Sequence, residues 1–271
     1  MRSLRPTHAL RQWRRASVMA LVLLAGCGTS PPDETSNWTP EKLYSEAKQE
    51  AAAGNYDRAA KLYERLEGRA TGGMLAQQAQ LERAFLLWKT NEKAQALAAI
   101  ERFLKLHPSS PAVDYALYLQ GLINFNDNLG ILGSIAGQDL SERDQQASRD
   151  AYQSFKQLID AYPQSVYAED SRVRMNYIVN SLAAYEVHVA RYYLRRGAFV
   201  AAANRAQQTV LEFQNSPAAE EALYILAQAY DRLGLEQLRD DTKRVLQKSF
   251  PNSALDTQGL TTRKRAWYQF W

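Results

Sequence analysis

The sequence predicts an all-α protein built from a row of helix pairs, on three observations. From residue 41 onward the chain is rich in Ala, Leu, Gln, Glu, Lys and Arg, which favour helices. Apolar residues recur at steps of three and four, as at Leu62, Tyr63 and Leu66. Similar segments return about every 37 residues, which is typical of repeat proteins.

Three kinds of recurring mark divide the chain into about five helix pairs. Small residues let the two helices of a pair approach closely, and turn residues that tolerate a positive φ join them. Pro ends the second helix, and a neighbouring Ser or Asn can cap the next one. The small residues are Ala47, Ala84, Gly121, Ala190 and Ala227; the turns begin at Gly54, Asn91, Gly197 and Gly234; the closing segments are 106–112, 161–168, 213–219 and 250–254.

This order of marks resembles the tetratricopeptide pattern, which implies a right-handed superhelix with a concave groove for holding other polypeptides. Two pairs depart from the regular length. The third has about 18 extra residues between its helices, in the Gly-rich segment 127–147. The first helix of the fourth is longer by about 14 residues and is expected to run roughly from Tyr167 to Arg195.

The first 26 residues have the composition of a signal peptide. Five arginines precede a short apolar stretch, Ala16 to Gly26, and no acidic residue occurs before Asp33. The stretch is too short to span a bilayer, which takes about 20 apolar residues. Without those arginines, 28 basic residues remain against 29 acidic ones, so the net charge of +4 becomes −1. We therefore expect no nucleic-acid partner, because such a partner requires a basic stripe.

Cys27 is the only cysteine, and it follows Leu24-Ala25-Gly26 directly. The segment resembles the lipobox of bacterial lipoproteins, which implies that Cys27 becomes the acylated first residue of the mature chain. The alternative is an ordinary signal peptide with an incidental Cys. The lipoprotein resemblance implies three acyl chains, and two or more anchor a protein stably. Gly28 after the cysteine, in place of an Asp, implies sorting to the outer membrane.

An enzyme is not expected, because the residues that catalysis requires are missing. His8 lies in the signal, His107 stands at a helix end, and His188 has Glu186 two residues away instead of the four that place two ligands on one helix face. The sequence has no Gly-rich phosphate loop, no nucleophile elbow and no second cysteine. We therefore expect no catalytic residue, no metal and no cofactor.

An ordered set of motifs resembles the BamD family, the tetratricopeptide lipoproteins of the outer-membrane β-barrel assembly machinery. The set comprises the lipobox, a Pro-rich tether, "DYALYLQGL" at 114–122, "SERD" at 141–144, the segment from Phe155 to Asp170, and the run from Tyr185 to Arg205. The match covers nearly the whole mature chain. It supports four regions: signal peptide 1–26, lipidated flexible tether 27–40, repeat domain 41–255 and basic-aromatic tail 256–271.

The resemblance implies a non-enzymatic subunit anchored by its lipid on the periplasmic face of the outer membrane. Its C-terminal repeats are expected to bind the periplasmic domains of the central barrel-forming subunit, and its N-terminal repeats to bind unfolded outer-membrane proteins, here called clients. Accessory assembly lipoproteins are further expected partners. The alternative is another periplasmic tetratricopeptide adaptor, for example one that organises peptidoglycan enzymes, which has no reason to carry the Arg-Gly-Ala-aromatic…Asn-Arg run.

The resemblance also implies site residues. The partner-binding residues are Arg205, Asn204, Arg196, Gly197 and Glu212. Arg205 is expected to form a salt bridge with the central subunit, and a planar guanidinium suits bidentate capture of a carboxylate. We expect Arg205→Glu to weaken that binding and leave helicity intact.

The client-binding residues implied by the family are Tyr56, Arg69 and Gly73. Here the first repeat departs from the family pattern, because "GRATGGML" has Ala70-Thr71 where the family has an aromatic residue and Pro. Only Arg69 and Gly73 match, which leaves this site open. The tail 256–271 also has three open interpretations: a disordered end, an interfacial membrane anchor, or an occupant of the client groove.

The lipobox predicts a specific mature N-terminus. Mass spectrometry of the protein purified from membranes is expected to show a chain that begins at Cys27 and carries acyl groups. A mature N-terminus without acyl groups would contradict the lipoprotein assignment.

Overall fold

The computed structural model describes residues 34–70, 72–125 and 145–255, and these ranges contain ten helices and no strand. The all-α prediction is confirmed. Cys27, the signal peptide, most of segment 127–147 and the tail 256–271 lie outside the described residues. The helices are α2 (Pro40–Ala52), α3 (Tyr56–Arg69), α4 (Met74–Lys89), α5 (Lys93–Leu106), α6 (Val113–Asn124), α8 (Gln145–Ala161), α9 (Ala168–Arg195), α10 (Phe199–Glu212), α11 (Ala218–Arg232) and α12 (Glu236–Ser249).

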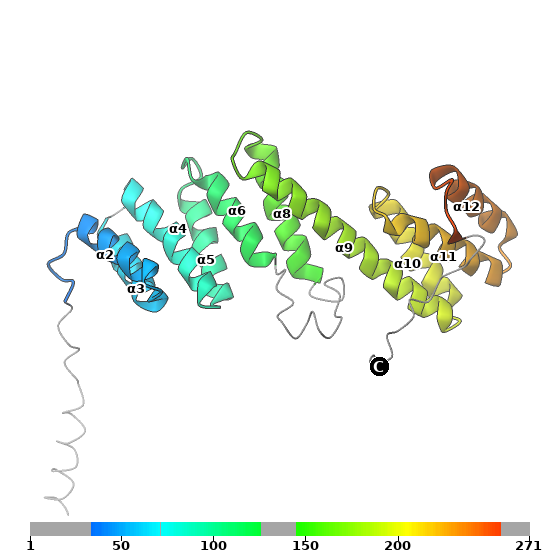
Figure 1. Cartoon of the computed structure of the whole chain (residues 1–271), viewed down its shortest axis with the longest axis horizontal. Helices are drawn as coiled ribbons and strands as arrows, with labels where there is room; N and C mark the ends of the chain where they lie inside the picture. The colour runs from blue at the N-terminus through cyan, green and yellow to red at the C-terminus, as the bar shows by residue number, and fades with distance from the viewer. Residues whose placement is uncertain (1–33, 71, 126–144, 256–271) are drawn as a thin grey trace, which may run out of the picture.

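The helices form five consecutive pairs, which stack side by side from the N-terminal to the C-terminal end of an elongated molecule (Figure 1). The long α9 runs diagonally through the stack, and its bounds agree with the predicted helix from about Tyr167 to Arg195. None of the described helices has a stretch apolar and long enough to cross a bilayer.

The turns inside the pairs lie where the sequence predicts them. The predicted turn residues all have a positive φ, which side chains other than Gly or Asn adopt at a cost. The values are 83° at Gly54, 66° at Asn91, 77° at Gly197 and 71° at Gly234. Each of these residues therefore allows the chain to reverse tightly between two antiparallel helices.

A serine hydroxyl shapes the local turn at four closing segments. In each case the hydroxyl oxygen accepts a hydrogen bond from the backbone N–H two residues further on. The serines are Ser110, Ser165, Ser216 and Ser253, at distances of 3.2–3.3 Å. This local turn differs from the capping predicted from the sequence, because at Ser110, Ser165 and Ser216 the N-cap position of the next helix belongs to a later residue.

The five predicted small residues are all buried, and Gly121 shows why one must stay small. Gly121 lies on α6 against the fully buried Phe155 of α8. A Cβ atom at Gly121 would lie 2.4 Å from Cε1 of that ring, closer than real carbon contacts allow. The glycine therefore sets the distance between the two helices of the third pair.

The apolar core is shared between neighbouring pairs. One cluster joins Leu81 of α4, Phe103 of α5, Leu117 of α6 and Leu158 of α8. Another joins the C-terminal half of α9 to α10 and α11. Each pair consequently buries its apolar surface against the next one, as expected for a repeat protein.

We predict that Gly121→Ala destabilises the protein by about 1–3 kcal/mol, because the added methyl group overpacks against a ring that has no free space to move into. Urea unfolding followed by circular dichroism measures the change. Gly68→Ala, in open space on α3, is the matched control and is expected to raise stability by about 0.5–1 kcal/mol. Equal effects of the two substitutions would contradict the close-contact explanation.

Candidate partner-binding surface

The α9–α10 hairpin brings together most of the residues predicted to bind the partner. Arg196 and Gly197 form its turn. Arg205 lies on α10, about 9 Å along the helix axis from Phe199, the first residue of that helix. The Cζ atom of Arg196 lies 5.6 Å from the centre of the Tyr192 ring, which is cation–π distance. Both of these side chains are exposed, so the turn presents a cation supported by an aromatic face.

Arg205 forms an ion pair inside the molecule. Its Nη1 donates to Oε2 of Glu186, on α9, over 2.8 Å. The Glu186 side chain is 6% exposed, whereas that of Arg205 is 42% exposed. The carboxylate is therefore buried between the helices while part of the guanidinium still faces solvent.

This ion pair changes the test that the sequence suggested. Arg205→Glu would place a second carboxylate against a buried one and leave both without a cation, so it would disturb the fold as well as any partner contact. Arg205→Gln retains an amide donor without adding charge. It is the more suitable substitution for separating the two effects.

The outer face of α10 carries an exposed stripe beside Arg205. Val200 and Leu211 are 60% and 64% exposed, and Asn204 is exposed between them. Their spacing of four and then seven residues places all three on one side of the helix. Glu212, at the end of α10, is exposed and accepts a hydrogen bond of 3.0 Å from Gln208.

A hollow of about 290 Å³ opens where the hairpin turn meets the end of α11. Arg195 and Arg232 line it from α9 and α11, together with Leu194, Gly197, Phe199 and Gln228. Neither arginine has an ion pair within the described ranges. Arg195 and Arg232 thus place positive charge beside the hairpin turn without an ion pair in the described residues, whereas the charge of Arg205 is balanced by Glu186.

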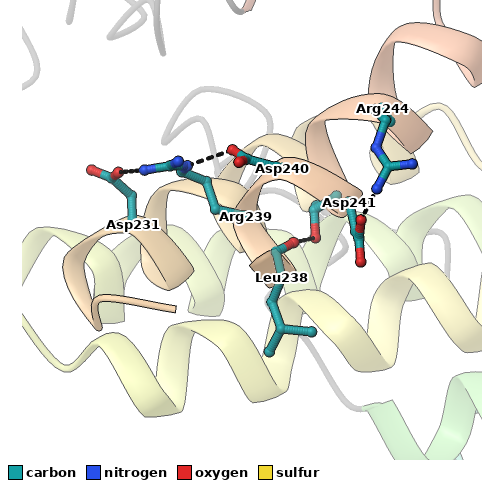
Figure 2. A network of polar contacts seen from close by, with 7 residues as sticks. Asp231, Leu238, Arg239, Asp240, Asp241 and Arg244 are labelled. Atoms are coloured by element: carbon teal, nitrogen blue, oxygen red, sulfur yellow. Dashed lines mark hydrogen bonds and ion pairs between the residues drawn. The ribbon is translucent and has the colours of Figure 1, made fainter. Parts of the chain in front are cut away.

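The arginines of α12 provide a contrast. Arg239 donates to Asp231 over 3.0 Å and to Asp240 over 2.7 Å, and Arg244 pairs with Asp241 (Figure 2). The hydrogen bonds to Asp240 and Asp231 raise the pKa of Arg239. The two arginines of α12 are therefore paired with nearby carboxylates, whereas Arg195 and Arg232 near the hairpin turn are not paired within the described residues.

Two further contacts fix α9 in place, and sequence reasoning did not find them. Arg191 binds Glu221 of α11 in a bidentate ion pair with two distances of 2.6 Å. At the other end of α9, Asp170 accepts hydrogen bonds from Tyr118 and Arg174, of 2.8 and 2.5 Å. Burial disfavours the charged form of Asp170 and by itself would raise its pKa. The hydrogen bonds from Arg174 and Tyr118 outweigh the effect of burial and keep the pKa of Asp170 below its usual value.

The residues predicted to bind clients do not form one site. Tyr56 and Arg69 stand at opposite ends of α3, about 20 Å apart along the axis. The Nη1 atom of Arg69 donates to the backbone oxygens of Thr35 and Trp38 over 2.5 and 3.1 Å, so the guanidinium holds the segment that precedes α2. Gly73 has a φ of −68° and is the N-cap residue of α4.

A half-buried acid marks the N-terminal repeats. Burial raises the pKa of Glu82, on α4, against the opposing attraction of Lys48. The same carboxylate contributes to raising the pKa of Tyr44, Tyr63 and Tyr115, after their own burial. As for metals, the described part of the chain has no group of three or more His, Cys, Asp or Glu side chains placed to hold an ion.

Comparisons with known proteins agree with the motifs. A profile of the YfiO family, described as an outer membrane lipoprotein, matches residues 36–246. The outer membrane protein assembly factor BamD of Neisseria meningitidis serogroup A is 47% identical over 255 residues, with 93% of this chain and 96% of the relative covered. BamD of Neisseria gonorrhoeae is 46% identical with the same coverage, and BamD of Vibrio cholerae is 35% identical over 86% of this chain and 96% of its own. These relatives are named as assembly factors, not as enzymes.

We predict that Arg205→Gln lowers the free energy of unfolding by about 1–3 kcal/mol, because Glu186 loses its cation while remaining buried. Arg205→Glu is expected to cost more. Urea unfolding measures both, with Arg196→Gln as the control on the same hairpin, expected to stay within about 0.5 kcal/mol of wild type. If Arg205→Gln behaved like the control, the ion pair would have no role in stability.

Proposed function

The chain belongs to the BamD family of outer membrane lipoproteins, and we propose that it serves outer-membrane protein assembly by binding two kinds of polypeptide. One is the central barrel-forming subunit of the machinery, and the other is the unfolded outer-membrane client. Accessory lipoproteins of the machinery are further partners. In this proposal the protein is a scaffold that holds other chains and performs no chemistry.

The observation that carries the proposal is the α9–α10 hairpin. It presents Arg205 next to the exposed stripe of Val200, Asn204 and Leu211 on α10. The core that α9, α10 and α11 share holds this hairpin in place. Partly apolar, arginine-bearing surfaces are typical of protein–protein interfaces. We assign the C-terminal repeats to the barrel-forming subunit, with Arg205 bound to one of its carboxylates. Asn204, Arg196, Gly197 and Glu212 are assigned to the same interface.

The lipid anchor completes the proposal. Acylated Cys27 would hold the chain on the periplasmic face of the outer membrane, and residues 28–40 would tether the repeats. The repeat domain 41–255 then faces the periplasm, where the partner's soluble domains and the clients are found. For the clients we propose the N-terminal repeats, although Arg69 is already bonded to the chain itself and so is not assigned a direct role.

The test is affinity purification of the lipidated full-length protein, with identification of the proteins that co-elute. A large outer-membrane barrel protein is expected. Recovery of peptidoglycan enzymes without a barrel protein would support the alternative adaptor function and contradict this one.

We predict that Arg205→Gln reduces the affinity for the purified barrel-forming subunit by about tenfold, because a charge-assisted contact is lost. The affinity of the wild type is also expected to fall as salt increases. Arg172→Gln, at a half-exposed arginine near the start of α9, is the matched control and is expected to leave affinity unchanged. Equal affinities of all three proteins would remove Arg205 from the interface.

A further inference from the structure

Glu186 is the one charged residue among the buried residues of the described ranges. Every other buried polar side chain there is a hydroxyl or an amide, namely those of Thr35, Gln80, Asn124, Ser154, Ser171, Thr209, Ser216 and Thr242. Removing a carboxylate from water costs several kcal/mol even when it is paired. A helix pair closed by small and apolar residues has no structural need for such a group.

The partner of Glu186 does not make it a strong stabilising pair. The carboxylate is engaged through Oε2 by a single nitrogen of Arg205, and this arginine remains half-exposed. Buried ion pairs of this kind often contribute less to stability than apolar residues of the same size. Stability of the fold therefore does not account for the presence of the acid.

The pair has a clear effect on Arg205. A free arginine side chain on a helix surface populates many rotamers, and binding a partner must freeze them. Glu186 lies on α9 with a side chain that is only 6% exposed, next in sequence to the buried Val187. By holding Nη1 of Arg205, it keeps the planar guanidinium in one orientation, with the remaining donors of its fork available on the solvent side.

We propose that Glu186 is a positioning residue, whose role is to hold the Arg205 guanidinium pre-oriented for a carboxylate of the barrel-forming subunit. The proposal rests on the proposed function, since it requires Arg205 to contact that subunit. The effect comes from the hydrogen-bond acceptor at Glu186 and not from its charge, because a negative charge so close would by itself repel the partner's carboxylate.

The test measures affinity of the full-length protein for the purified full-length barrel-forming subunit. Two substitutions separate acceptor from charge: Glu186→Gln keeps a hydrogen-bond acceptor of the same shape, whereas Glu186→Met removes acceptor and charge alike. Each is made in the wild-type background and in the Arg205→Gln background. Glu221→Met, which breaks the other interhelical ion pair of α9, is the matched control, and urea unfolding is measured for every variant.

The expected result is that Glu186→Met binds about three- to tenfold more weakly, the cost of reordering a long side chain, and that Glu186→Gln stays within about twofold of wild type. In the Arg205→Gln background neither substitution changes affinity further, because there is no guanidinium left to position. Glu221→Met leaves affinity unchanged.

Other outcomes overturn the proposal in distinguishable ways. If Arg205→Gln alone has no effect on affinity, the proposed contact and the positioning role both fail. If Arg205→Gln weakens binding but Glu186→Met does not, the contact stands and the positioning role fails. Tighter binding by both Glu186 variants would show that the acid acts by repulsion, and equal losses in both backgrounds or in Glu221→Met would show general loosening of the repeats.

Discussion

No helix pair among the described residues closes a core of its own. The apolar clusters cross from one pair to the next, so that Phe103 of the second pair and Leu158 of the third belong to one contiguous core. Close approach inside a pair depends on small residues, most sharply on Gly121 against Phe155. The shape of the molecule follows from repetition of these two contacts, which also fix the position of the proposed partner-binding surface.

The same constraint holds the proposed partner-binding surface in place, because the hairpin that carries it shares its core with a neighbouring helix. The α9–α10 hairpin has its apolar residues in the shared core, and its charged residues are left at the edges. Arg205 is restrained by Glu186, while Arg195 and Arg232 line a hollow without ion pairs in the described ranges. The two arginines of α12 are instead paired with Asp231 of α11 and with Asp240 and Asp241 of α12 itself, which makes them less available to an acidic partner.

The sequence predicted what depends on local spacing. Turn residues such as Asn91 and the small residues inside the pairs were correctly located, because they recur about every 37 residues. The length of α9 was correctly predicted because the spacing of these marks increases there. The sequence did not reveal the Glu186–Arg205 and Arg191–Glu221 pairs, since these depend on the rotation of one helix against another. The sequence pattern places Glu186 near His188 and within the run from Tyr185 to Arg205, but it does not indicate the ion pair with Arg205. The distance between Tyr56 and Arg69 has another cause, because the two residues stand at opposite ends of the same helix.

The length of α9 has a mechanical consequence. Its first half packs on α8 and is anchored to α6 through Asp170, while its second half belongs to the core with α10 and α11. A continuous helix of 28 residues measures about 42 Å and bends little. The first three helix pairs and the last two are therefore joined by one continuous helix and move together as a rigid body. In the proposed function, a barrel-forming subunit bound to the last two pairs would therefore also set the orientation of the first pairs, where we propose that the client binds.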